Sequence, residues 1–270
     1  MQRDFLHATL GKVRTPVFRL GLSATYRPGI ETIHRAIGEG LNYLFCFGID
    51  TQMTAALRDV LRRDREHYVV ATGAYYYIWW GQNLRRTLEK RLRQLRTDYI
   101  DVFHFLGVLR EKELTPRVRG ELEELRHDNR VGAVSISTHN RALAGRLLDN
   151  GTLDAAMIRY NAAHRGAEKE IFPYLERHRP GVVSFTATRW RRLLHRPRGW
   201  PAARPVPTAG MCYRFVLSNP HVDVCLTAPS NARQFAANLA EVRKGPLSQE
   251  EMQRMRDFGD AVYGRYKGTA

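Results

Sequence analysis

Short apolar runs alternate with longer amphipathic segments along the whole sequence. The apolar runs cover residues 17–23, 41–45, 68–72, 101–105, 133–137, 156–160, 182–186 and 222–226. Such alternation is typical of repeated strand–helix units whose strands lie parallel in one sheet. Eight units fit a single parallel (β/α)8 barrel, a fold that needs about 250 residues. The pattern therefore predicts one α/β domain over residues 1–270.

The segments between the apolar runs have the spacing of surface helices. Leucines recur every three or four residues over 84–95, and basic residues occupy the opposite face. This arrangement is expected of a helix packed on the outside of a barrel. An additional helix is predicted from Ser248 to about Val262, where Ser248 and Glu251 have the spacing of a capping box.

The composition adds a strong positive charge. The net charge is +16, and all but six of the 43 basic residues are arginines. Such a charge suits an anionic partner, such as nucleic acid, acidic lipid or a phosphorylated cofactor. Because the arginines are scattered over nearly every predicted helix, a GC-rich coding sequence explains them, and we expect no nucleic-acid partner. Only one loop concentrates them, with Arg189, Arg191, Arg192, Arg196, Arg198 and Arg204.

The location of the protein is predicted from what the sequence lacks. No stretch approaches the roughly 20 apolar residues of a membrane span. The first residues, MQRDFLHATL, contain no long apolar run. The three cysteines are too few and too unevenly spaced for a disulfide framework or a thiolate metal cage. We therefore expect a cytoplasmic protein that binds neither membrane nor metal.

Several segments resemble the aldo-keto reductase family, in the family's order and over nearly the whole chain. They include RLGLSATY, GLNY, LRQLRTDYIDVF, RVGAVSIST, MIRYN, EIFPYLERHRPGVVSFTA and RFVLSNPHVDVCLTAPSNARQFAANL. The resemblance implies a (β/α)8 barrel that binds NADP(H) or NAD(H) at its carboxyl face. It also implies an oxidoreductase whose small-molecule ligand lies at that face.

The same resemblance places different side chains at all four positions of the family's chemistry. Phe45 stands at the aspartate, Asp50 at the tyrosine, Gly73 at the lysine and Leu106 at the histidine. In the family the tyrosine is the general acid, the lysine and aspartate lower its proton affinity, and the histidine orients the carbonyl. We therefore expect ordinary carbonyl reduction to be severely slowed.

Three residues are candidates for replacement chemistry. Asp50 is a carboxylate whose pKa burial would raise, or else the N-cap of the following helix. Tyr75 lies in the aromatic run 74–80 after the third strand and either reaches the barrel mouth or lines an apolar pocket. Arg159, at the end of the sixth strand, holds an anionic ligand or pairs with an internal carboxylate. His104 is expected to be a hydrogen-bonded core residue.

The cofactor positions implied by the resemblance are partly kept. Phe185 stands where an aromatic ring stacks on the nicotinamide, and Ser137 and Thr138 stand where the carboxamide is held, while Met157 replaces a glutamine. The predicted pyrophosphate loop contains Thr186, Thr188, Arg189, Trp190 and Arg191. The predicted adenine end contains Ser230, Asn231, Gln234 and Asn238. An ordinary solvated loop and a plain helix N-cap are the respective alternatives.

Three functions remain open from the sequence. The first is a divergent aldo-keto reductase-like oxidoreductase that binds a nicotinamide nucleotide and runs altered chemistry or none. The second is a non-catalytic ligand-binding or regulatory barrel, favoured by the four substitutions. The third is an accessory protein held to anionic surfaces, favoured only by the net charge.

Overall fold

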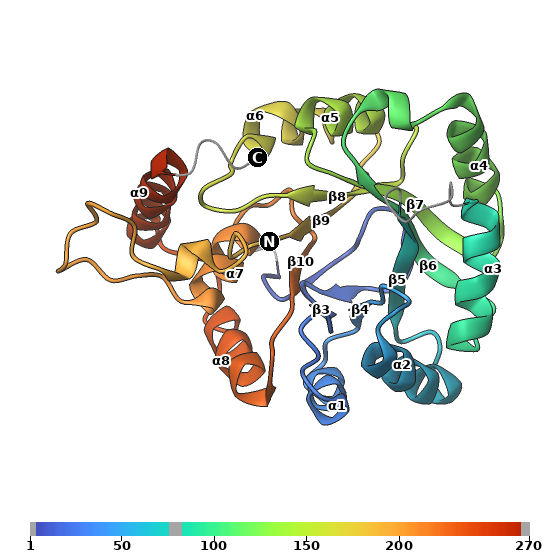
Figure 1. The fold of residues 1–270 in the computed structure, drawn as a ribbon, viewed down its shortest axis with the longest axis horizontal. Helices are drawn as coiled ribbons and strands as arrows, with labels where there is room; N and C mark the ends of the chain where they lie inside the picture. The colour runs from blue at the N-terminus through green and yellow to red at the C-terminus, as the bar shows by residue number, and fades with distance from the viewer. Residues whose placement is uncertain (1–3, 76–82, 266–270) are drawn as a thin grey trace.

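The computed structural model describes residues 4–75 and 83–265, and its centre is a closed barrel of eight parallel strands (Figure 1). The strands are joined in the order β10-β3-β4-β5-β6-β7-β8-β9. Their bounds are β3 (Leu20–Ser23), β4 (Tyr43–Phe45), β5 (Val69–Tyr75), β6 (Ile100–Val108), β7 (Val131–Thr138), β8 (Ala155–Arg159), β9 (Gly181–Phe185) and β10 (Val224–Thr227). The predicted parallel (β/α)8 barrel is therefore confirmed.

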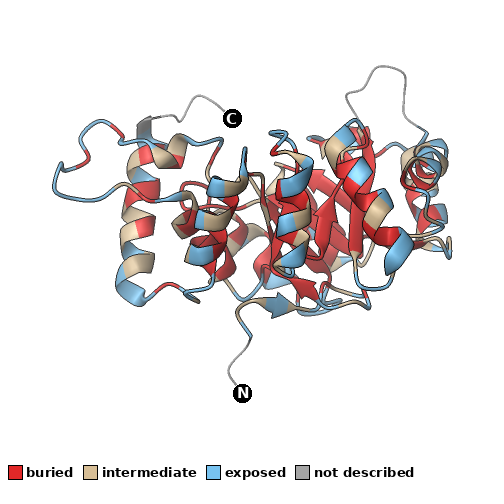
Figure 2. Cartoon of the chain, turned by 90° about the horizontal axis from the view of Figure 1, so that it is seen from below, coloured by how far each residue is buried: buried red, intermediate tan, exposed pale blue. Residues whose placement is uncertain are grey.

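Helices surround the barrel, with buried inner faces and exposed outer faces (Figure 2). They are α1 (Ile30–Gly38), α2 (Thr51–Arg63), α3 (Leu84–Leu95), α4 (Pro116–Arg126), α5 (Arg141–Asp149), α6 (Ala167–Glu170), α7 (Ala209–Leu217), α8 (Ala232–Val242) and α9 (Gln249–Arg265). Three single 3₁₀ turns are η1 (Glu111–Glu113), η2 (Phe172–Tyr174) and η3 (Arg192–Leu194). Between η3 and α7 a long loop extends beside α9 at the left of Figure 1.

Local capping explains where two predicted helices begin. The side chain of Asn83 accepts a hydrogen bond from the N–H of Arg86 at 2.7 Å, which starts α3 at the predicted Leu84. The Ser248 hydroxyl accepts from the N–H of Glu251 at 3.1 Å, and the Glu251 carboxylate accepts from the N–H of Ser248 at 2.9 Å. This reciprocal pair is the predicted capping box, and it confirms the additional carboxyl-terminal helix.

A hairpin that the sequence pattern did not predict closes the amino-terminal end of the barrel. It pairs β1 (His7–Ala8) with β2 (Val17–Phe18) in antiparallel fashion. The predicted strand 17–23 is therefore wrong as one element, because its first two residues belong to the hairpin and only Leu20–Ser23 joins the barrel. Leu10, Val13 and Val17 of the hairpin segment pack into the barrel interior. The hairpin thus seals the base of the barrel.

Arg19, between the hairpin and β3, ties the start of the chain to its last third. Its side chain is almost fully buried. The guanidinium donates to the carbonyl oxygen of Leu217 at 2.8 Å and to that of Val222 at 2.6 Å. These bonds fix the ends of α7 and of the turn before β10 against the first barrel strand.

Two further properties concern membranes and cysteines. No helix among the described residues has the length and the apolar character needed to cross a membrane. Cys46, Cys212 and Cys225 are all buried and free.

Candidate functional site

Phe45 and Leu106, which the resemblance places at two positions of the family's chemistry, are apolar side chains in the barrel interior. They are 1% and 3% exposed. The Phe45 ring meets the rings of Phe47 and His104 edge to face, with centroids 4.6 Å and 5.7 Å apart. Neither side chain can transfer or orient a proton. Both are part of the hydrophobic core.

His104 is a core histidine, as the sequence predicted. It is fully buried, and its Nε2 lies 3.4 Å from the hydroxyl of Tyr43. Burial lowers the pKa of His104 to about 3, so the ring is neutral at pH 7. Its Nδ1 has no hydrogen-bond partner among the described residues. The ring therefore behaves as part of the packing below the mouth.

Gly73, at the position of the family's lysine, is held against the neighbouring strand. It lies opposite His104 in the register of β5 and β6. A Cβ atom on Gly73 would collide with the main-chain oxygen of His104. Any side chain at this position requires the two strands to move apart, so the structure of β5 and β6 itself excludes a lysine here.

Asp50, at the position of the family's tyrosine, is the N-cap of α2. Its Oδ1 accepts a hydrogen bond from the N–H of Met53 at 3.1 Å. Its Oδ2 is buried and has no partner among the described residues. Burial raises the pKa of this carboxyl above its usual range. One oxygen thus caps the helix and the other is left for a ligand, and a catalytic role for Asp50 stays a prediction.

A cavity of about 470 Å³ opens beside Asp50 at the carboxyl face. It is lined by Ala24, Thr25, Arg27, Phe47, Ile49, Asp50, Thr51 and Tyr75. The rings of Tyr75 and Phe47 stack with centroids 5.7 Å apart. Burial raises the pKa of Tyr75, so its phenol keeps its proton at neutral pH. The rest of the predicted aromatic run, from Tyr76 to Trp80, lies outside the described residues.

Arg91 of α3 supports the floor of this cavity, a role that the sequence did not indicate. Its buried guanidinium donates to the carbonyl oxygens of Phe47 and Gly48, each at 3.2 Å. Gly48 has a φ of 80°, and a Cβ atom there would collide with the guanidinium. The loop after β4 is therefore fixed by Arg91, and this holds Phe47 and Asp50 in place.

The other half of the mouth, at the ends of β7, β8 and β9, is cationic. Arg159 is half-buried and lies opposite Phe185 in the register of β8 and β9. Its pKa is lowered by burial and by the neighbouring Arg141 and Arg189. No carboxylate of the described residues forms an ion pair with it, so the expected pairing with an internal acid such as Asp50 is wrong.

Two histidines beside Arg159 were missed by the sequence reasoning. The His139 ring lies 5.3 Å from the ring of Phe185, centroid to centroid. His164 is 7% exposed and packs edge to face against Tyr263 of α9. In the described structure the Nδ1 atom of each histidine is buried without a partner.

Both histidines are neutral at pH 7. Burial and the charge of Arg159 lower the pKa of His139 to about 4. Burial followed by the charges of Arg159, Arg189 and Arg141 lowers that of His164 to about 3. The only sequence signal for this cluster is that His139 and His164 follow the fifth and sixth predicted strands, where the active face lies.

The loop after β9 has an unusual backbone. Thr186, Arg189, Trp190 and Arg191 all have φ between 49° and 69°. Non-glycine residues rarely adopt this left-handed conformation, and it concentrates at functional sites. The hydroxyl oxygen of Thr186 is buried with no partner among the described residues. A strained loop with an unused polar atom is suited to a ligand.

Two side chains of this loop have clear positions. Arg189 is buried, and its guanidinium donates to the carbonyl oxygen of Val262 in α9 at 2.9 Å. It therefore anchors the loop to the last helix. Trp190 is 54% exposed, with its ring centroid 6.1 Å from that of His139. The N–H of Arg191 donates to the hydroxyl of Thr188 at 3.3 Å.

Ser137 and Thr138, the predicted carboxamide pair, end β7 close to this loop. The Ser137 hydroxyl accepts from the N–H of Gly107 at 3.0 Å, and that of Thr138 accepts from the N–H of Asn140 at 2.9 Å. Each hydroxyl keeps its own proton for donation. Met157, which replaces the family's glutamine, is buried in the barrel interior.

The predicted adenine end forms the cap of α8. Asn231 is its N-cap and accepts from the N–H of Gln234 at 2.9 Å. The Gln234 side chain accepts from the N–H of Ser230 at 2.9 Å. The Asn238 amide donates to the hydroxyl of Thr227 at 3.5 Å. The plain N-cap interpretation therefore describes these contacts, and adenine binding stays a prediction.

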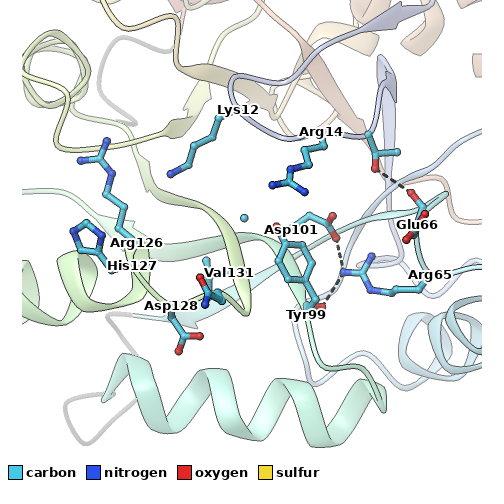
Figure 3. A pocket seen from close by; sticks show the side chains of 13 residues that line it. Lys12, Arg14, Arg65, Glu66, Tyr99, Asp101, Arg126, His127, Asp128 and Val131 are labelled. Atoms are coloured by element: carbon cyan, nitrogen blue, oxygen red, sulfur yellow. Dashed lines mark hydrogen bonds and ion pairs between the residues drawn. The ribbon is translucent and has the colours of Figure 1, made fainter.

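A cavity of about 780 Å³ lies at the opposite end of the barrel (Figure 3). Several of its basic groups are paired with carboxylates. Arg65 binds Asp101 at 2.7 Å, while Lys12 and Arg126 bind Asp154 at 2.9 Å and 3.1 Å. Paired charges at the amino-terminal end of a barrel are typical of stability.

The described residues contain no group of three or more His, Cys, Asp or Glu side chains that could hold a metal ion.

Comparisons with known proteins agree on the fold. No protein-family model matches the sequence, and no curated protein matches it. The holo form of an aldo-keto reductase from Bacillus halodurans is similar in structure, with a TM-score of 0.77 and 20% identity, over 94% of this chain and 96% of that chain. An aldo/keto reductase from Klebsiella pneumoniae, solved in complex with NADP and acetate, has a TM-score of 0.75 and 18% identity, over 94% and 95%. The chain therefore has the aldo-keto reductase fold.

Proposed function

We propose that this protein is a divergent aldo-keto reductase-like oxidoreductase that binds NADP(H) or NAD(H) at the carboxyl face, with altered or lost carbonyl-reduction chemistry. The observation that carries the proposal is the loop after β9. Its left-handed residues, the unused hydroxyl of Thr186 and the anchored Arg189 together suit a phosphate group. A similar structure holds NADP, which supports the same class of cofactor here.

The residues present fit a dinucleotide at several points. Phe185 offers a partly exposed ring for the nicotinamide, and Ser137 and Thr138 lie beside it on β7. Thr186, Thr188 and the basic loop would hold the phosphates. The cofactor would supply hydride. The described residues would bind and orient the cofactor. Asp50 offers a titratable oxygen in the cavity that Phe47 and Tyr75 also line.

A second candidate is a non-catalytic ligand-binding or regulatory barrel. It is favoured by one specific observation, the collision that any side chain on Gly73 would make with the main-chain oxygen of His104. Together with the apolar Phe45 and Leu106, this closes the region where the family transfers its proton. We propose a cytoplasmic location for either candidate, since all three cysteines are free.

Titration with NADPH and NADH, followed by tryptophan fluorescence, tests cofactor binding. We expect a saturable change, because Trp190 is half-exposed beside His139 and the proposed phosphate loop. The variant Thr186→Val should weaken the affinity about tenfold, since it removes one hydrogen-bond donor to a charged group. Thr152→Val, in the turn after α5, is the matched control.

Aldehyde reduction at saturating NADPH then separates the two candidates. Turnover above the uncatalysed rate supports an oxidoreductase, and binding without turnover supports the non-catalytic barrel. If neither nucleotide gives a saturable change, the oxidoreductase proposal is wrong.

A further inference from the structure

We propose that Arg159, with His139 and His164 beside it, binds the oxyanion of a second small molecule, a carboxylate or phosphate group, at the barrel mouth next to Phe185. The inference deepens the proposed function and rests on it, because it names the chemical class of the ligand that shares the mouth with the nicotinamide. The guanidinium of Arg159 carries a charge that has no counter-ion in the described structure.

Arg159 is a guanidinium that the fold leaves without a partner. It is half-buried, and neither a hydrogen bond nor an ion pair joins it to the described residues. Removing a guanidinium from water is costly unless an anion compensates it. Arg141 and Arg189 are close enough to lower its pKa further. Partial burial of Arg159 thus costs desolvation free energy, and an anionic ligand would offset this cost.

The carboxylates of the adjacent elements are already engaged. On α6, Glu170 binds Arg141 at 2.7 Å, and Glu168 binds Arg256 at 2.8 Å. Glu168 also accepts from the hydroxyl of Tyr160 at 2.7 Å. A rotation of Arg159 toward α6 would therefore break an existing pair.

The same holds on α9, where Asp260 binds Arg165 at 2.7 Å. Each of these acids already has a cation, so none of them is left over for Arg159. An anion from outside the chain is the simplest way to complete the cluster.

The two histidines complete the site as neutral groups. His164 is more than nine-tenths buried, and its Nδ1 makes no hydrogen bond within the described residues. The same is true of Nδ1 of His139, whose ring packs on Phe185. A neutral imidazole carries one N–H donor and one acceptor, so it can donate to an oxyanion without adding a full charge. Arg159 would supply the positive charge, and the N–H groups of the histidines would orient the oxyanion.

Phe185 indicates what the rest of the ligand is like. Arg159 and Phe185 are paired neighbours at the ends of β8 and β9, so the oxyanion would lie next to an aromatic ring. The phosphate loop starts one residue later, at Thr186, and extends toward α9. Arg159 is therefore next to the start of that loop. This position suits a small organic acid or phosphate ester beside the cofactor.

Calorimetric titration with two probes, sodium acetate and inorganic phosphate, tests the site and distinguishes the two sources of oxyanion. Each probe is measured with and without saturating NADPH. The variants are Arg159→Met, which keeps the apolar stem, and Arg62→Met on the exposed surface of α2 as the matched control. We expect Arg159→Met to weaken the preferred probe at least tenfold and the NADPH affinity less than threefold. We expect Arg62→Met to leave the preferred probe unchanged.

The outcomes separate this inference from the proposed function. Equal probe affinity in wild type and Arg159→Met, with the variant folded by its thermal transition, overturns the inference. A loss of NADPH binding in Arg159→Met that is as large as the loss of probe binding also overturns it, because Arg159 then serves the dinucleotide. If NADPH does not bind to wild type but a probe binds through Arg159, the proposed function fails and the oxyanion site stands.

Discussion

The two halves of the barrel mouth differ in the side chains that they present. At the ends of β3 to β6, Phe45 and Leu106 are packed in the core and Gly73 is in contact with β6, while the Oδ2 atom of Asp50 has no partner among the described residues. At the ends of β7 to β9, Arg159 and the Nδ1 atoms of His139 and His164 have no partner among the described residues. The first half is mostly apolar, and the second half is cationic.

This difference shows that one barrel mouth can combine a closely packed half with a half whose polar groups lack partners. Buried polar groups are normally paired, and exceptions in folded proteins need a reason. The packed half contains Phe45, Gly73 and Leu106, which the resemblance places at positions of the family's chemistry. In the other half, a bound anion would supply the partners that Arg159 and the two histidines lack. Three changes test this contrast.

The largest effect is expected from restoring the family's lysine by Gly73→Lys. Because a Cβ atom already collides with the main-chain oxygen of His104, β5 and β6 must separate, and we expect a loss of about 3 kcal/mol or more in the free energy of unfolding. Urea denaturation followed by circular dichroism measures this loss.

Gly120→Lys is the matched control for that variant. Gly120 lies within α4, and nothing would lie within 4 Å of an added Cβ atom. We expect a gain of up to about 1 kcal/mol there, from the better helix propensity of lysine. A stable Gly73→Lys variant that reduces aldehydes would show that this half of the mouth is still competent for the family's chemistry.

A smaller effect is expected from protonation of the buried His104. Its pKa is about 3 in the folded chain and about 6.5 in the unfolded chain, so between these values the unfolded chain binds a proton that the folded chain does not. The free energy of unfolding therefore falls as the pH is lowered through this window, and His104 contributes about 2 kcal/mol of this fall between pH 6.5 and 5. His104→Phe should reduce the slope of stability against pH by about one proton.

Val102→Ala is the control for this experiment, because it changes the packing of the same barrel interior and removes no titratable group. The slope should not change in that variant. An unchanged slope in His104→Phe would mean that His104 is protonated in the folded protein, which would contradict its neutral state in the core.

The smallest effect separates the two roles of Asp50. Asp50→Asn keeps a good N-cap and should change the free energy of unfolding by only a few tenths of a kcal/mol, whereas Asp50→Ala should cost about 1 kcal/mol. Thermal unfolding measures both variants. If NADPH-dependent turnover is detected and is the same in Asp50→Asn as in wild type, Asp50 has no catalytic role.

Most of the barrel could be predicted because its strands are buried on both faces. Such strands appear as continuous apolar runs, and each of the eight predicted runs overlaps a barrel strand, although 17–23 also included the second strand of the hairpin. The amino-terminal hairpin was missed because its two strands have only two residues each. The hairpin is held in place because Leu10 and Val13 pack into the barrel interior, against residues far away in the sequence. Such contacts produce no regular spacing of apolar residues within the hairpin itself.

The site could be predicted only where a residue's role follows from the chain itself. Asp50 was recognised as an N-cap because a cap is local. The state of Arg159 could not be predicted, since it depends on the engagement of Glu168, Glu170 and Asp260 by other cations. The role of Arg91 depends likewise on a contact with Gly48, 43 residues earlier.

The sealed base of the barrel bears on the order in which the protein folds. Arg19 and Gly11 are synthesised well before their partners Leu217 and Gly181. A Cβ atom on Gly11 would meet the N–H nitrogen of Gly181 at 2.6 Å, so the two segments meet closely only when β9 is in place. Such non-local contacts form slowly and leave early segments exposed in the meantime. The contacts of the hairpin therefore need the last third of the chain, and we expect the base of the barrel to close late in folding.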